Sequence, residues 1–413
     1  MVAAATPARM LRAIATLARA PRIYRLILAA EQKVLRILFR ESAREFTSDF
    51  AMTLMGRLWS VARKANSSGS SGPSRAYCTK DHMIRFGIVG FGRHATKRLM
   101  PGFRQAKCCR VTALSRRGLQ WAQESAREFG VEHAFASARE LCASTEVDAV
   151  FVATPDALHL ADVLEAVRHG KPVLCEKPMA RSGDEARAMV SAAREAGVAL
   201  GVAHVMRFEE SVKLFRSQIA AGVIGQPQVA RADFLAPLLS STRKWINDPN
   251  LATGGPLADV GVHCIDTLRF ILGREVVAVS ARAHHDQHWV VEASGAMLLE
   301  FTGGVLATVS VSARSPYRTF LEVAGETGVL SALNGLSIDQ PPVVELRRAF
   351  EVIESREVSN ANAYAAQVDA FAAAIEKGRD FEVPGEEGLS NQLVLDAAFR
   401  SVKTGRAEPV SQC

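Results

Sequence analysis

The chain has 413 residues, of which 48% are hydrophobic and 23% charged, a globular composition long enough for more than one hydrophobic core. Its net charge of +7 comes from the first 80 residues, which hold 14 Lys and Arg against 4 Asp and Glu, whereas the remainder is slightly acidic. We therefore exclude nucleic-acid binding for the main body, and no apolar stretch approaches the roughly 18 residues of a transmembrane span.

Residues 1–82 form a basic extension ahead of the main body. Residues 1–30 contain five arginines and no acidic residue, with Leu11, Ile14 and Leu17 at helical spacing. This pattern is typical of an organelle-targeting presequence or of an amphipathic helix on a membrane surface. A plain upstream extension that ends in the flexible linker 66–74 explains it equally well. We therefore expect a cytoplasmic protein, or an organellar one if the extension is a presequence.

Residues 84–95, IRFGIVGFGRHA, combine a short apolar run with a glycine-rich turn. The run 84–89 predicts a buried parallel strand, and a helix could begin near Arg93. Gly90, Gly92 and Ala95 have the GxGxxA spacing of a dinucleotide-binding turn, in which the pyrophosphate lies on the backbone at the helix N-terminus. A plain turn is the alternative. On the first interpretation the cofactor contacts Gly90, Phe91, Gly92, Arg93 and His94.

Residues 110–117 predict the second strand, whose end is the position that reads the cofactor's ribose. Selection of NAD usually places an Asp or Glu there, but this chain has Ser115, Arg116 and Arg117. Guanidinium groups bind a 2′-phosphate, and each charged hydrogen bond contributes roughly 1.5–3 kcal/mol, enough for about a tenfold to hundredfold preference. We predict NADP, with NAD less favoured. Alternatively, the two arginines merely begin the next helix.

Strand-like and helix-like stretches then alternate, and this order predicts a doubly wound parallel (Rossmann) sheet over 83–205. Strands are expected at 134–136, 147–155 and 171–178, and helices at 97–106, 119–129 and 158–168. The regular alternation favours the dinucleotide interpretation of the glycine turn over a plain turn.

Four motifs in this order, GxGxxA, ATPDALH (153–159), GKPVLCEKP (170–178) and RF (207–208), resemble the glucose-fructose oxidoreductase and inositol dehydrogenase family, Gfo/Idh/MocA. The resemblance runs from about residue 84 to the C-terminus. It implies an NAD(P)-dependent oxidoreductase in which the motif residues Ala153, Thr154, Pro155, His159, Glu176 and Lys177 bind the cofactor. His159 could equally be a helix cap.

The stretch 254–273, GGPLADVGVHCIDTLRFILG, predicts one helix from Pro256 to Gly273. Asp259, His263 and Asp266 then lie on one face, which alone fits an ordinary satisfied helix face. The DxGxHxxD pattern after a GG turn is, however, the resembled family's signature. The resemblance implies Lys177, Asp259 and His263 as catalytic residues. His263 would take a hydroxyl proton, Lys177 would stabilise an alkoxide, and Asp259 would hold the substrate or orient the imidazole.

Arg207, Trp245 and Tyr364 are the candidate substrate-binding residues. The resemblance supports Arg207, while Trp245 could form a wall of the pocket, with Arg243 or Lys244 meeting a polar group. His204 and Gln367 are weaker candidates. We expect no metal site, because the cluster His284, His285 and His288 lacks a carboxylate or cysteine pattern. The seven cysteines form no CxxC pair, which predicts free thiols in a reducing compartment.

Residues 206–413 predict an α+β domain for substrate binding and oligomerisation. Runs at 276–285, 296–314 and 319–333 are strand-like, and the tight turns between them predict a mostly antiparallel open sheet. In the resembled family such a sheet face forms subunit contacts, which implies a homodimer or homotetramer.

The resulting hypothesis is an NADP-dependent oxidoreductase that transfers a hydride to or from a secondary hydroxyl or carbonyl of a sugar, polyol or cyclic diol. Its partner is a small polyhydroxylated substrate. Two alternatives stay open. The chain could keep NAD(P) bound and use transient oxidation for a net hydrolysis or epimerisation, or it could bind the dinucleotide without catalysis.

Overall fold

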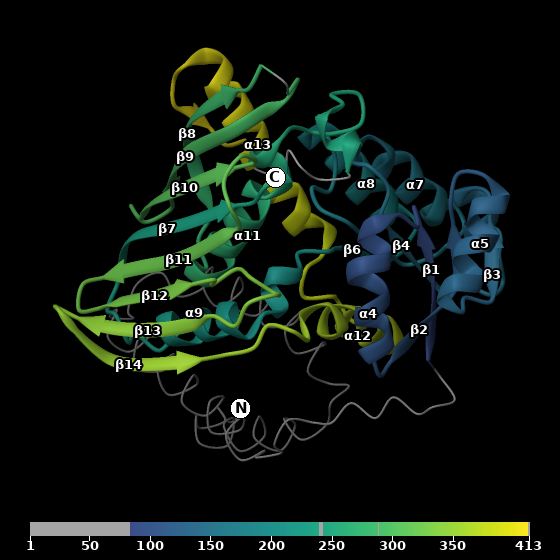
Figure 1. Cartoon of the computed structure of the whole chain (residues 1–413), viewed down its shortest axis with the longest axis horizontal. Helices are drawn as coiled ribbons and strands as arrows, with labels where there is room; N and C mark the ends of the chain where they lie inside the picture. Colours follow the sequence, from purple (N-terminus) through teal and green to yellow (C-terminus); the bar gives the residue numbers. More distant parts are fainter. Residues whose placement is uncertain (1–82, 239–242, 288, 412–413) are drawn as a thin grey trace, which may run out of the picture. The chain divides into compact units, whose positions relative to one another are not determined.

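The computed structural model describes residues 83–238, 243–287 and 289–411 (Figure 1). The basic extension 1–82 and His288 lie outside the described residues, so the predictions made for them stay predictions.

The first described part is built on a parallel sheet, as predicted. Its strand order is β3-β2-β1-β4-β5-β6, with parallel pairing throughout, so the carboxyl ends of the strands share one edge. The central strand β1 (Ile84–Val89) has the predicted bounds and is flanked by β2 (Cys109–Ser115) and β4 (Ala149–Val152). The shorter strands are β3 (His133–Phe135), β5 (Val173–Cys175) and β6 (Leu200–Val202).

Helices connect these strands. After the glycine turn, the chain forms the π-helical turn η2 (Ala95–Leu99) and continues as α4 (Met100–Gln105). The further helices are α5 (Leu119–Phe129), α6 (Ala138–Ala143), α7 (Asp156–Arg168) and α8 (Gly183–Glu195). The sequence analysis did not predict α6 and α8. Both begin after a serine, Ser137 and Ser182, whose hydroxyl caps the helix.

The second part is built on a larger sheet in the order β14-β13-β12-β11-β7-β10-β9-β8-β15. Its neighbours pair antiparallel except β7 and β10, so the expected mostly antiparallel sheet is confirmed. The strands are β7 (Pro227–Leu235), β8 (Val276–His285), β9 (Glu292–Phe301), β10 (Leu306–Ser312), β11 (Arg318–Gly325), β12 (Val329–Leu333), β13 (Val343–Arg348), β14 (Glu351–Glu357) and β15 (Glu408–Pro409).

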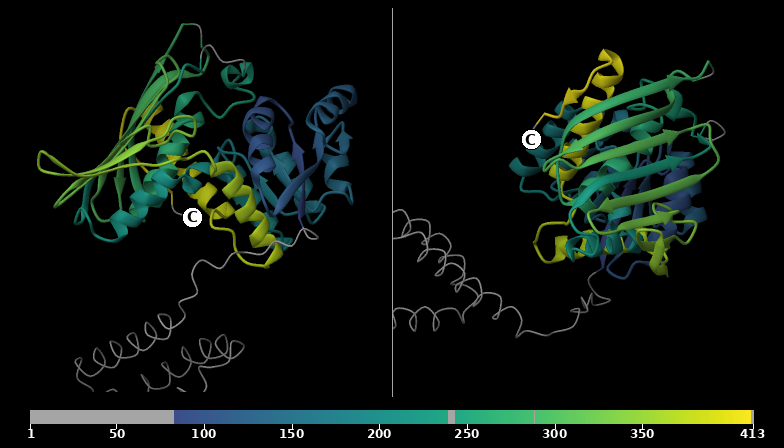
Figure 2. Two further views of the ribbon diagram at one scale, coloured as in Figure 1. Left: turned by 60° about the horizontal axis from the view of Figure 1, so that its bottom comes forward. Right: turned by 90° about the vertical axis from the view of Figure 1, so that its left-hand side faces the viewer.

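Helices cover one face of this sheet, and within the described residues the other face is bare (Figure 2). The helical elements of this part are η3 (Val205–Phe208), α9 (Glu210–Ala220), η5 (Lys244–Asn247), α10 (Pro256–Asp259), α11 (Gly261–Leu272), α12 (Ala363–Glu376) and α13 (Gly385–Thr404).

The last two long helices return to the first part. Helix α12 packs on α4 so closely that a Cβ added to Gly102 would lie 2.6 Å from the Cβ of Tyr364. Helix α13 contacts α8, where the backbone N–H of Gly183 donates to Asp396 at 2.8 Å. These contacts hold the two sheets in one arrangement around the site.

The helix predicted from Pro256 to Gly273 is broken at Val260, and this part of the prediction is wrong. Helix α10 ends at Asp259, and α11 begins at Gly261. A Cβ on Gly261 would lie 3.3 Å from the Met297 side chain of β9, so the chain here approaches the sheet closely. The predicted stop at Gly273 is confirmed by its left-handed φ of 61°.

The cysteines follow the prediction only in part. Cys109, Cys142, Cys175 and Cys264 are buried free thiols. Cys108 is disulfide-bonded, which corrects the expectation of free thiols throughout.

Candidate active site

Two cavities meet beside the carboxyl ends of the parallel strands. The glycine-turn cavity, of about 550 Å³, is lined by the turn 90–94, the end of β2 and the loops after β4 and β5. The inner cavity, of about 580 Å³, extends between η2, β7, α11 and α12. Both are lined by the same six residues, here called the junction: Arg93, His94, Glu176, Lys177, Arg243 and Asp259.

The glycine turn has the geometry that a dinucleotide needs. Gly90 has φ of 83°, and a Cβ there would lie 2.6 Å from Thr154, so only glycine fits. The N–H groups of Gly90 and Phe91 donate to the carbonyl of Ser115 at 3.2 and 2.9 Å. A Cβ added to Gly92 would meet nothing closer than the Gly90 carbonyl at 3.9 Å. Space is therefore left beside Gly92, where a pyrophosphate could approach the backbone.

Arg116 and Arg117 are exposed on the wall of this cavity, directly after β2. The Arg116 Nη1 donates to the Ser125 hydroxyl at 3.1 Å, which fixes the side chain along α5. Ser115 is buried, and its carbonyl accepts from the glycine turn. The end of β2 thus offers cations and no carboxylate to a ligand.

His159, together with Ala153, Thr154 and Pro155, lines the glycine-turn cavity, and both of its ring nitrogens are engaged. They lie 2.9 Å from the Thr154 carbonyl and 3.0 Å from that of Pro178. Burial opposes a charge on this ring, but Cys175, Asp156 and the Thr154 carbonyl raise the pKa of His159 to about 10. His159 therefore ties the loops after β4 and β5 together, and its contact with a cofactor stays a prediction.

Lys177, Asp259 and Arg243 form an ionic cluster within the junction. The Lys177 Nζ donates to the carbonyl of Asp259 at 2.8 Å and to its carboxylate at 3.3 Å. Arg243 donates to both carboxylate oxygens, at 3.3 and 2.8 Å. Burial opposes ionisation, but Arg243 and Lys177 hold the pKa of Asp259 well below its usual range. The structure therefore brings the predicted Lys177 and Asp259 into contact.

His263 lines the inner cavity and stacks on Phe234, with ring centroids 5.9 Å apart. Its Nδ1 is buried without a hydrogen-bond partner. Burial and the charges of Lys177 and His204 lower the pKa of His263 well below its usual range, so the ring is neutral.

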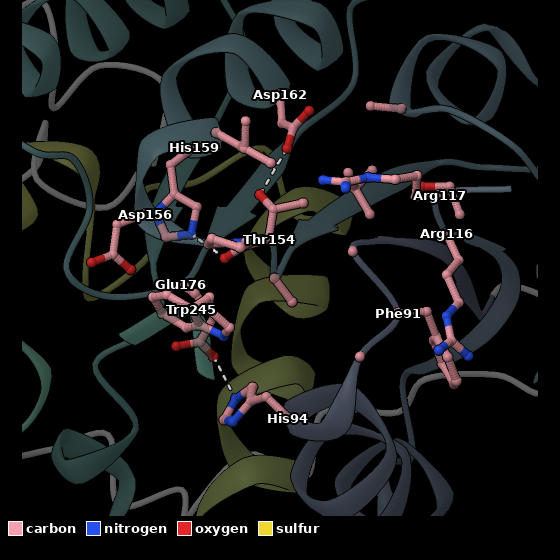
Figure 3. Close-up of a pocket in the computed structure, with 18 of the residues that line it drawn as sticks. Phe91, His94, Arg116, Arg117, Thr154, Asp156, His159, Asp162, Glu176 and Trp245 are labelled. Carbon is pink, nitrogen blue, oxygen red and sulfur yellow. Dashed lines mark hydrogen bonds and ion pairs between the residues drawn. The ribbon is translucent and has the colours of Figure 1, made fainter. Parts of the chain in front are cut away.

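His94 and Glu176 form an imidazole–carboxylate contact in the junction (Figure 3). The His94 Nε2 lies 2.8 Å from the Glu176 Oε1, and the other oxygen, Oε2, accepts from the backbone N–H of Lys177 at 3.2 Å. Burial opposes ionisation here also, but His94 and Lys177 lower the pKa of Glu176 to about 2. The ionised carboxylate can only accept, so Nε2 donates.

Of the three predicted substrate-binding residues, two line a cavity and one does not. Tyr364 lines the inner cavity, and Trp245 lines the glycine-turn cavity. Arg207 lines neither cavity, because it is 6% exposed and binds Asp266 through contacts of 2.6 to 3.0 Å. Asp266 is therefore not part of the face that His263 presents to the cavity. Arg243 binds Asp259, whereas a substrate group was its expected partner.

The weaker candidates lie away from both cavities. His204 is buried and its Nε2 accepts from Asn391 at 2.9 Å, while Gln367 is buried in α12 with its amide atoms unpartnered. Lys244 is exposed in η5 and lines neither cavity.

Several residues of the inner cavity were missed. Arg98 of η2 binds Asp339 through two contacts of 2.6 Å, and Tyr317 and Phe234 contribute rings. These residues come from distant segments that share no motif. Arg98 alone has a sequence signal, because it lies four positions after His94 and so on the same face of a helix.

Within the described ranges, no group of three or more His, Cys, Asp and Glu side chains could hold a metal ion. Nor is any of the described helices long and apolar enough to cross a membrane.

Comparison with known proteins identifies the family. Residues 84–204 match an oxidoreductase family with an NAD-binding Rossmann fold, and residues 212–331 match the GFO/IDH/MocA C-terminal domain. The 1,5-anhydro-D-fructose reductase of Ensifer adhaerens is 34% identical over 336 residues, 79% of this chain and 99% of the reductase. The D-xylose 1-dehydrogenase (NADP(+)) 2 of Haloferax volcanii is 30% identical and covers 78% and 99%.

A solved structure agrees with these matches. The aldose-aldose oxidoreductase from Caulobacter crescentus, complexed with glycerol, superposes with a TM-score of 0.73 at 26% identity, over 79% of this chain and 99% of the other. The expected resemblance is thereby confirmed, and the chain belongs to the Gfo/Idh/MocA family of oxidoreductases with an NAD(P)-binding Rossmann domain.

Proposed function

We propose that this chain is an NADP-dependent oxidoreductase that transfers a hydride between the nicotinamide cofactor and a secondary hydroxyl, or the matching carbonyl, of a sugar, polyol or cyclic diol. The observation that carries the proposal is the meeting of two cavities at the Lys177–Asp259 contact. One cavity contains the dinucleotide-type turn, and the other has room for a small molecule.

The residues of the glycine-turn cavity fit the cofactor, since Gly92 leaves space that a Cβ would fill. When bound there, NADP would supply the nicotinamide carbon that accepts or gives the hydride. The residues that would hold it are Gly90, Phe91, Gly92, Arg93, His94, Ser115, Arg116, Arg117, Ala153, Thr154, Pro155, His159, Glu176 and Lys177.

Lys177, Asp259 and His263 would act on the substrate. The neutral ring of His263 can accept a hydroxyl proton, as a general base must. The Lys177 ammonium, held at the junction by Asp259, can stabilise negative charge that develops on the substrate oxygen. Asp259 would act mainly by holding Lys177 and Arg243, because both cations occupy its carboxylate. Tyr364 would contact the substrate in the inner cavity, and Trp245 would close the site from the glycine-turn side.

The preference for NADP rests on Arg116 and Arg117, which are exposed on the cavity wall with no carboxylate at the end of β2. The name of the Haloferax xylose dehydrogenase, which specifies NADP(+), supports the same choice. Titration of the purified chain with NADPH and with NADH tests it, and equal affinity would refute the role of the arginines.

The substrate class rests on the relatives, whose names specify an anhydrofructose, a xylose and an aldose. The test is a panel of sugars and polyols with NADP, and the matching carbonyl compounds with NADPH, followed by NADPH absorbance. Turnover of added cofactor also separates this function from a net non-redox reaction on tightly bound cofactor.

The proposed assembly is a homodimer or homotetramer formed through the bare face of the larger sheet. Val229, Leu298, Leu306 and Leu333 are each 39 to 52% exposed on four different strands of this sheet. A charged substitution, Leu298→Lys, should yield a smaller species by light scattering, whereas an unchanged mass would refute this interface. For the compartment we propose the cytoplasm.

A further inference from the structure

We propose that His94, with its ring positioned by Glu176, is a second acid–base residue of the reaction, which receives from His263 the proton that the substrate loses in oxidation and returns it in reduction. This inference rests on the proposed function and adds a proton carrier to its mechanism. Glu176 is a positioning residue in it.

His94 has the required access. It lines both cavities, and 31% of its side chain is exposed, compared with 11% for Glu176. Its ring lies edge-on to Tyr364 with centroids 5.9 Å apart, so it borders the cavity in which a substrate would lie. Figure 3 shows the ring directed at Glu176, which follows β5.

The ring has a defined orientation. Because Glu176 is ionised and only accepts, the His94 Nε2 carries a hydrogen directed at Oε1. Nδ1 of the neutral ring is then the basic nitrogen. When Nδ1 accepts a proton, the carboxylate 2.8 Å from Nε2 stabilises the resulting imidazolium. This is the arrangement of an oriented imidazole–carboxylate base.

Asp259 and His263 do not have this arrangement. The Asp259 carboxylate binds Arg243 and Lys177, and the Nδ1 of His263 is buried without a partner. Burial and the nearby Lys177 disfavour an imidazolium at His263. A proton taken by His263 would therefore leave it readily, and His94 is the imidazole of the junction that can keep it.

The charges around His94 come from four parts of the chain. Its own segment supplies Arg93, Lys97 and Arg98, the loop after β5 supplies Glu176 and Lys177, α12 supplies Tyr364, and the segment between β7 and α11 supplies Arg243 and Asp259. Lys177 and Arg243 are paired with Asp259, and Arg98 with Asp339. Glu176 is the anion in direct contact with the ring.

The reaction moves one proton and one hydride from the substrate by separate routes. In oxidation the O–H bond of the substrate breaks, and its proton moves to His263 and from there to Nδ1 of His94. The C–H electron pair leaves as hydride to the oxidised nicotinamide cofactor, and the carbonyl double bond forms. The proton then passes from Nδ1 to solvent. Reduction runs these transfers in reverse.

The test compares His94→Gln and Glu176→Gln with a control, His169→Gln. His169 also contacts a glutamate, Glu165, at 3.3 Å, but it lies at the end of α7 and lines neither cavity. We expect His94→Gln to lower kcat by about 10²- to 10⁴-fold and to remove the acid limb of the pH–rate profile. Circular dichroism and the urea midpoint should match those of the wild type, which shows that the variant is folded. His169→Gln should match the wild type.

A second readout does not depend on turnover. Nitrogen-15 NMR of the ligand-free chain should show His94 protonated at Nε2 and bare at Nδ1 when its ring is neutral, and Glu176→Gln should weaken this preference. Wild-type kcat and an unchanged pH profile in His94→Gln would overturn the inference while leaving the proposed function intact. If the wild type converted no sugar or polyol, the proposed function would fail, and a hydrogen on Nδ1 in place of Nε2 would separately overturn the inference.

Discussion

Asp259→Asn is the substitution whose effect on stability follows most directly from the structure. The carboxylate holds the Arg243 guanidinium through two contacts and the Lys177 ammonium through a third. Removing one partner of a buried ion pair costs about 3–5 kcal/mol. Two features reduce the loss: the Arg243 side chain is 26% exposed, and Lys177 keeps the backbone carbonyl of residue 259 at 2.8 Å. We therefore expect the free energy of unfolding to fall by about 3 kcal/mol.

Urea denaturation followed by circular dichroism measures this loss. The control is Glu146→Gln, which removes a contact of 3.0 Å with Arg85 between side chains that are 31% and 47% exposed. Such an exposed pair contributes about 0–1 kcal/mol. Equal stability of Asp259→Asn and Glu146→Gln would refute the buried cluster as a source of stability.

The free energy of unfolding that the Lys177–Asp259–Arg243 cluster contributes should decrease at acid pH. The pKa of Asp259 is lower in the folded chain than in the unfolded chain, so the folded state binds fewer protons. Its stabilisation is present above the usual aspartate pKa and is lost as the pH falls below that range. In Asp259→Asn this acid-dependent loss should be absent.

Three further predictions concern the cofactor turn and the buried core. Arg116→Ala with Arg117→Ala should weaken NADPH binding about tenfold to hundredfold by calorimetry and leave NADH binding unchanged, and an equal loss for both would contradict NADP selection. Gly92→Ala should keep the stability of the fold but weaken cofactor binding. Gly90→Ala should unfold more easily, because a Cβ at residue 90 would lie 2.6 Å from Thr154 and the φ of that residue is 83°. Urea midpoints that rank the two glycine variants in the opposite order would contradict this. Burial lowers the pKa of His204 to about 4, so stability should fall as the pH drops from the usual histidine range toward 4. His204→Gln should flatten that slope, and an unchanged slope would exclude His204 as its cause.

Local patterns predicted the parts of the fold that depend on neighbouring residues. The bounds of β1, the turn at Gly90 and the helix stop at Gly273 all follow from apolar periodicity and glycine conformation. The break at Val260 could not be predicted, because it depends on the approach of Gly261 to Met297 on β9.

The site residues could be predicted where a sequence motif specifies them. They could not be predicted where an ion pair between distant segments determines the position of the side chain. Lys177 and Asp259, which the resemblance supplied, are in contact although they are 82 positions apart. Arg207 was expected at the substrate, but a buried guanidinium requires a carboxylate, and Asp266 satisfies it. The pairing of His94 with Glu176 likewise has no signal in the spacing of either residue.

Hydride transfer is the central claim, and isotope transfer tests it most directly. NADPH carrying deuterium at both hydrogen positions of the reactive nicotinamide carbon is incubated with the purified chain and a panel of sugar carbonyl compounds, and the products are analysed by mass spectrometry. The account predicts a polyol or sugar product with deuterium on the new carbinol carbon. Product that lacks deuterium, or no consumption of the labelled cofactor with any compound of the panel, would contradict it.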